Sequence, residues 1–124
     1  MRITIAAIGR MKSGPERELV WRYLDRATGG GKPMALTGFD VIELPESRAS
    51  SAASRKADEA KALRAALPEG VLVMMDERGK SLTSESFAGQ IERWRDDGRP
   101  AVSFVIGGAD GIDPDFVRSA DLAI

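Results

Sequence analysis

The stretch from Ala101 to Pro114, AVSFVIGGADGIDP, constrains the fold more than any other part of the chain. An apolar run over residues 102–106 breaks into a glycine-rich turn over 107–111, and Asp113-Pro114 has the pattern of a helix cap and first helical residue. A strand that is apolar at nearly every position is typical of a parallel sheet covered on both faces, where ligands bind beyond the carboxyl ends of the strands. Two interpretations of the turn remain open: a ligand site, or a tight turn whose glycines only supply positive φ.

The rest of the chain alternates strand and helix patterns. The predicted strands cover Ile3–Ile8, Phe39–Leu44, Val71–Met75, the run after Ala101, and a start at Leu122; helices are predicted after Ser13, over about Ala53–Leu67, after Ser81, and over Pro114–Ala120. This alternation predicts an α/β fold in three layers, a mostly parallel sheet with helices on both faces. No linker or repeat divides the chain, so we expect residues 1–124 to form a single domain.

The first predicted helix carries both a start signal and an apolar stripe. Ser13 and Glu16 have the spacing of a capping box, which predicts a helix start at this point. The apolar stripe, which we expect to face the core, consists of Leu19, Val20, Tyr23, Leu24 and Ala27. Trp21 falls outside this stripe. It either belongs to a surface that binds a partner or is covered by a loop, and we favour the loop.

Composition excludes several classes of chemistry. The chain has 124 residues, a net charge of -1, no cysteine and no histidine. Thiolate chemistry, cysteine or histidine metal sites and a Ser-His-Asp triad are therefore absent, and we expect no metal. The apolar run at the N-terminus is too short for a signal sequence or a spanning helix, so we expect a cytoplasmic protein without a membrane segment.

Two groups of basic residues have more than one interpretation. Arg10 and Lys12 follow the first predicted strand, where they contact an anion or are simply solvated loop charges. Arg48, Arg55 and Lys56 surround the start of the second predicted helix. They form either a solvated face with local ion pairs or a contact with an RNA backbone.

Three segments together resemble one enzyme family over essentially the whole chain. They are the N-terminal ITIAAIGRMK, the central VMMDERGKSLTSESFA and the late FVIGGADGID. Taken together they resemble the ribosomal RNA large-subunit methyltransferase H family, a branch of the SPOUT (α/β-knot) methyltransferases. The combination of the central motif, at the end of a predicted strand, with the later glycine motif is a more specific signal of this family than either motif alone.

The resemblance implies an activity and a set of partners. Members of the family are homodimers that use S-adenosyl-L-methionine to methylate N3 of a pseudouridine in 23S rRNA of the assembled ribosome. By this resemblance Met75 and Gly107 contact the cofactor, whereas Gly108 and Gly111 shape the same loop. It assigns no catalytic residue in this chain.

The chain departs from the family pattern at its end. Members continue with a further strand, a Pro-His-x-x-x-Arg segment and a C-terminal helix, and neither this motif nor any histidine occurs here. We therefore expect a SPOUT-like fold that lacks its C-terminal knot segment. We also expect the 124-residue chain to be inactive and to bind S-adenosylmethionine weakly or not at all, which calorimetry tests.

Two other functions are compatible with the residues. A non-catalytic, ribosome-associated α/β binding domain would co-sediment with ribosomes without transferring a methyl group. A flavodoxin-like nucleotide-binding protein would use the same crevice for a phosphate. The second is disfavoured because IGRMKSG, after the first predicted strand, is a poor match to a phosphate loop.

Overall fold

All five strands of the sheet run in the same direction. A computed structural model describes residues 1–124 and gives the strand order β2-β1-β4-β3-β5. The strands are β1 (Arg2–Ile8), β2 (Phe39–Leu44), β3 (Val71–Met75), β4 (Ala101–Ile106) and β5 (Leu122–Ala123). The helices are α1 (Pro15–Gly31), α2 (Ala52–Ala66), α3 (Ser84–Asp96) and α4 (Pro114–Arg118), with a short 3-10 turn, η1 (Lys32–Met34), after α1. The predicted α/β fold is confirmed, and the sheet is parallel throughout.

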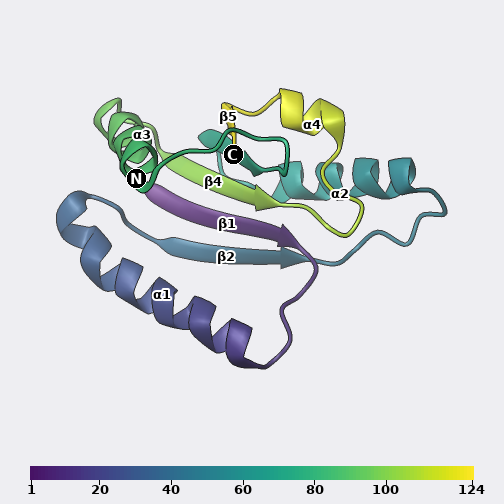
Figure 1. The fold of residues 1–124 in the computed structure, drawn as a ribbon, viewed down its shortest axis with the longest axis horizontal. Helices are drawn as coiled ribbons and strands as arrows, with labels where there is room; N and C mark the ends of the chain where they lie inside the picture. The colour runs from purple at the N-terminus through teal and green to yellow at the C-terminus, as the bar shows by residue number, and fades with distance from the viewer.

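Helices cover both faces of the sheet, which gives the three predicted layers (Figure 1). The helices α2 and α4 pack on one face, where Leu63 and Phe116 contact Met74 and Val105. The helices α1 and α3 lie on the other face, where Trp94 belongs to the core cluster. Because side chains alternate along a strand, neighbouring strand residues contribute to opposite layers.

The central strands β1, β3 and β4 supply most of the core. Val73, Met74, Val102 and Val105 are fully buried, and each side chain of this size stabilises the fold by roughly 1.5–3 kcal/mol relative to an exposed position. Near-continuous burial of β3 and β4 explains why their sequences are apolar at consecutive positions. None of the helices is long and apolar enough to cross a membrane.

The start of α1 differs from the prediction. Gly14 is the N-cap residue, and no side chain accepts a capping hydrogen bond there. The prediction of a capping box formed by Ser13 and Glu16 is therefore wrong. Pro15 occupies the first turn, where its fixed φ favours helix initiation without a side-chain cap. The predicted cap of α4 is confirmed, since Asp113 accepts a hydrogen bond from the N–H of Phe116 at the start of this helix.

The core stripe predicted on α1 is only partly confirmed. Leu24 is buried, but Leu19 and Tyr23 are exposed. Trp21 is 48% exposed, so the prediction that a loop covers it is wrong. The helix runs alongside the edge strand β2 (Figure 1), and most of its residues are exposed.

Candidate functional site

A polar crevice of about 350 Å³ opens beyond the carboxyl ends of β3 and β4. Its volume lies within the range of roughly 300–1,000 Å³ that is typical of small-molecule sites. The four residues that the family resemblance marks as cofactor-binding all line it. The complete lining is Lys56, Met75 to Arg78, and Ile106 to Ile112.

The glycine loop, defined here as residues 107–111, leaves one backbone donor free. The N–H of Gly107 donates to no other backbone group, whereas Gly108 and Gly111 pair with each other in an isolated antiparallel bridge, in which the N–H of Gly111 donates to the carbonyl of Gly108. Gly111 has a φ of 87°, which favours glycine. The loop therefore offers the unpaired N–H group of Gly107 to a ligand.

Gly107 has no room for a side chain. A Cβ atom there would lie 2.7 Å from Ile112 and 2.9 Å from the backbone carbon of Gly111. At Gly108 a Cβ would lie 3.0 Å from Ile8 and 3.2 Å from a carboxylate oxygen of Glu59. Glycine at these positions lets the loop fold back on itself and pack closely against β1 and α2.

Met75 forms the apolar side of the crevice. It ends β3, lies opposite Ile106 in the β3–β4 register, and is 42% exposed, although Met74 beside it is fully buried. An exposed methionine that lines the same crevice as the free N–H of Gly107 gives a surface with one apolar and one polar side.

An ion pair that sequence reasoning did not anticipate holds the glycine loop to α2. Arg55 donates from Nε and Nη2 to the two carboxylate oxygens of Asp110, at 2.7 and 3.2 Å. The hydrogen bond from Arg55 lowers the pKa of Asp110, and the same bond raises the pKa of Arg55. Arg55 is thus bound to the protein itself, and its predicted alternative role in contacting RNA is not favoured by this geometry.

Glu59 is a buried carboxylate beneath the same loop. Its Oε2 accepts a hydrogen bond from the N–H of Ser47 at 3.0 Å, whereas Oε1 is buried without a partner. The residue is 6% exposed and belongs to α2. The sequence pattern did not indicate that Glu59 is buried, because alternating charges around it are typical of a solvated helix face.

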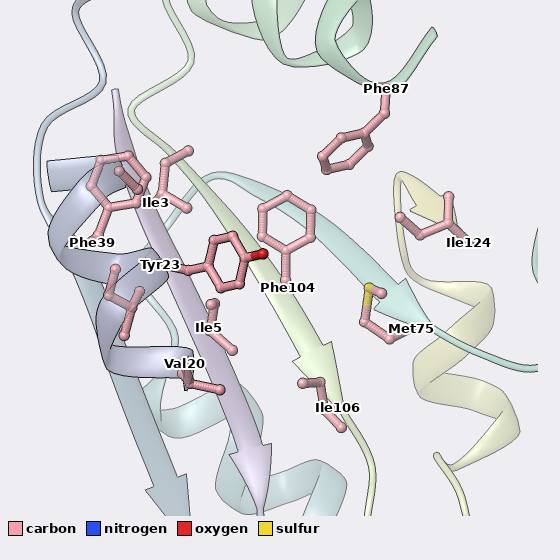
Figure 2. A pocket seen from close by; sticks show the side chains of 12 residues that line it. Ile3, Ile5, Val20, Tyr23, Phe39, Met75, Phe87, Phe104, Ile106 and Ile124 are labelled. Carbon is pink, nitrogen blue, oxygen red and sulfur yellow. The ribbon is translucent and has the colours of Figure 1, made fainter. Parts of the chain in front are cut away.

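An entirely apolar groove of about 430 Å³ lies between α1 and α3, over the strands β1, β4 and β3 (Figure 2). Figure 2 shows Tyr23 of α1 and Phe87 of α3 on either side of Phe104, and the rings of Phe87 and Phe104 lie 5.8 Å apart. Met75 and Ile106 line both this groove and the crevice. The two hollows therefore meet at the ends of β3 and β4.

No group of three or more acidic, histidine or cysteine residues is arranged to hold a metal ion. The crevice provides the backbone donor of Gly107, the apolar side chains of Met75 and Ile106, and charged side chains of both signs, which are Lys56, Arg78, Asp76, Glu77 and Asp110. This combination suits a small molecule that has both an apolar part and hydrogen-bonding groups.

The parallel α/β fold agrees with that of a SPOUT methyltransferase, because the family model described as "Predicted SPOUT methyltransferase" matches residues 1–124. The chain belongs to that family. Its similarity extends to proteins named "Ribosomal RNA large subunit methyltransferase H". Those of Bradyrhizobium sp. strains ORS 278 and BTAi1 are 50% and 52% identical over the whole chain, which spans 77% and 78% of their lengths. The protein of that name from Rhodopseudomonas palustris strain HaA2 is 50% identical, and the chain spans 78% of its length.

Proposed function

We propose that this protein is a cytoplasmic, S-adenosylmethionine-dependent enzyme that methylates N3 of a pseudouridine in 23S rRNA of the assembled ribosome, as a homodimer. Residues 1–124 contribute one methyltransferase domain. The observation that carries the proposal is the unpaired N–H of Gly107, within close-packed glycines beside Met75, in a chain of the SPOUT family.

The residues present fit the cofactor. Gly107 leaves a backbone donor free at the crevice, the absence of a side chain at Gly107 and Gly108 lets the loop pack closely, and Gly111 shapes the turn. Met75 supplies an apolar contact at the opposite side of the crevice. When bound, S-adenosylmethionine supplies an electrophilic methyl group on a sulfonium ion. The role of these four residues is to bind and orient it.

The RNA substrate is supported by the relatives, which are named as methyltransferases of large-subunit ribosomal RNA. The net charge of -1 does not contradict this. An enzyme that recognises an assembled RNA–protein surface needs only local basic contacts, and not a basic surface overall.

Homodimer formation is supported by exposed apolar side chains on α1. Leu19 and Tyr23, four positions apart, lie exposed on one face of this helix, and Trp21 lies exposed on another. Large exposed aromatic residues are typical of interface anchors.

A methyl-transfer assay tests the proposal. Protein expressed from the complete reading frame is incubated with S-adenosylmethionine labelled in its methyl group and with ribosomes from a strain that lacks the modification. We expect label in 23S rRNA at N3 of one pseudouridine, located by nuclease digestion and mass spectrometry. Co-sedimentation with ribosomes without transfer would instead support a binding domain, and bound nucleotide or flavin absorbance would support the flavodoxin-like alternative.

A further inference from the structure

A second polar cleft lies at the same edge of the sheet as the crevice, beyond the ends of β1 and β2. We propose that Arg10 and Arg48 form a subsite in this cleft that binds a backbone phosphate of the RNA substrate. The inference rests on the proposed function, because it assigns residues that hold the RNA whose methylation is proposed above. The cleft measures about 360 Å³ and is lined by Gly9, Arg10, Pro45, Glu46, Ser47 and Arg48.

The position of the cleft suits a substrate of the crevice. The strands β1 and β4 are adjacent and parallel, so the loops that follow them leave the sheet at the same edge. Gly108 of the glycine loop packs against Ile8, the last residue of β1. An RNA strand whose base reaches the crevice would therefore pass its backbone near the ends of β1 and β2.

The main chain on both sides of Arg10 is fixed by hydrogen bonds. The N–H of Gly9 donates to the carbonyl of Leu44 at 2.7 Å. The N–H of Met11 donates to a carboxylate oxygen of Glu43 at 2.6 Å. These two contacts hold the loop against β2, whereas the side chain of Arg10 is exposed.

The main chain around Arg48 is held in the same way, from α2. The N–H of Ser47 donates to the buried carboxylate of Glu59, and the hydroxyl of Ser47 donates to Asp58 at 2.9 Å. The carbonyl of Ala49 accepts a hydrogen bond from Arg55 at 3.1 Å. A segment without helix or strand structure is thus fixed on both sides of an exposed arginine.

Neither guanidinium is neutralised by a neighbouring carboxylate. Arg10 and Arg48 take part in none of the ion pairs of the structure, whereas Arg55 is committed to Asp110. Glu46 is the one acidic residue among those lining the cleft, and it forms no ion pair with either arginine.

This arrangement gives two free guanidinium groups on fixed backbones. Arginine binds phosphate oxygens through paired N–H donors, and a fixed backbone reduces the entropy lost on binding. The carboxylates of Glu43 and Glu59 bind backbone N–H groups, and in this way they position the two loops.

Kinetics with ribosomes as substrate test the subsite. The variants are Arg10→Ala, Arg48→Ala and the double variant, in protein expressed from the complete reading frame. A matched control is Arg99→Ala, which removes the same charge just before β4, at the opposite edge of the sheet. We expect KM for ribosomes to rise on the order of tenfold in the double variant, and the slope of log KM against log salt to fall by about 1 per phosphate contact removed.

Three further readouts separate a phosphate contact from a structural effect. The affinity for S-adenosylmethionine and kcat stay unchanged in the double variant, and Arg10→Lys with Arg48→Lys restores part of the KM. An unchanged KM and salt slope in the double variant would overturn the subsite, as would an equal effect of Arg99→Ala. If the unmodified protein transfers no methyl group, it is the proposed function that fails.

Discussion

The side chains of Arg55 and Asp110, 55 positions apart in the sequence, meet through two hydrogen bonds and join α2 to the glycine loop. Arg55 also donates to the carbonyl of Ala49, so one guanidinium contacts both the segment before α2 and the loop after β4. This side chain links the crevice beyond β3 and β4 to the segment that carries Arg48. We expect the geometry of the loop to depend on it.

The Arg55–Asp110 pair predicts a specific pH dependence. The hydrogen bond and the charge of Arg55 lower the pKa of Asp110 in the folded protein. The stability that the pair contributes is therefore complete above the ordinary aspartate pKa of about 3.9, and it is lost as pH falls through the lower folded value. In Arg55→Gln we expect the Asp110 pKa to rise, as measured by carbon NMR of the side-chain carboxylate during an acid titration. An unchanged pKa would show that Arg55 does not hold this carboxylate in solution.

Gly107→Ala tests the close packing of the glycine loop. The new Cβ would meet backbone atoms of Gly111 and the side chain of Ile112, and relieving such overlap costs about 1–3 kcal/mol. We expect S-adenosylmethionine to bind about 10-fold more weakly in calorimetry with the complete reading frame's product. The matched control is Gly89→Ala in α3, where a Cβ meets nothing within 4 Å. The control should keep its affinity and gain up to about 1 kcal/mol of stability.

Alanine variants of the neighbouring residues Met74 and Met75 distinguish a residue of the core from a residue that binds the cofactor. Met74→Ala empties a fully buried site and should lower the free energy of unfolding by about 2–5 kcal/mol in urea titration. Met75→Ala alters a half-exposed side chain and should cost less than about 1 kcal/mol of stability. The same change should weaken S-adenosylmethionine binding about 5- to 10-fold, through lost apolar contact. Unchanged affinity in Met75→Ala would remove this residue from the cofactor site.

Much of the fold is predictable because its signals are local. The strands β1, β2 and β3 are apolar runs that end at glycine, proline or charged residues, and their predicted bounds agree with the structure to within one residue. The start of α4 follows from Asp113 and Pro114 alone. The α1 cap was mispredicted because two start signals overlap, and the proline favours Gly14 as the cap over Ser13.

The site is less predictable, since it depends on which strands are neighbours. Met75 and Gly107 come together because β3 pairs with β4, a contact that no local pattern specifies. The same is true of Arg55 and Asp110, each of which reads as a solvated charge in isolation. Glu59 is buried only because the Ser47 segment and the glycine loop both lie against it.

Trp21 provides a test of the proposed homodimer. It is a large exposed aromatic side chain on α1, on a different face of the helix from the exposed Leu19 and Tyr23. Loss of an aromatic anchor at an interface commonly costs 2 kcal/mol or more, so we expect Trp21→Ser to weaken the dimer by at least about 10-fold in analytical ultracentrifugation. Arg22→Ser, at the adjacent exposed position, is the control and should leave the association unchanged. Because Trp21 is not part of the core clusters, the variant should unfold at nearly the same urea concentration as the parent. A dimer that is equally stable in both variants would place the interface elsewhere than on this part of α1.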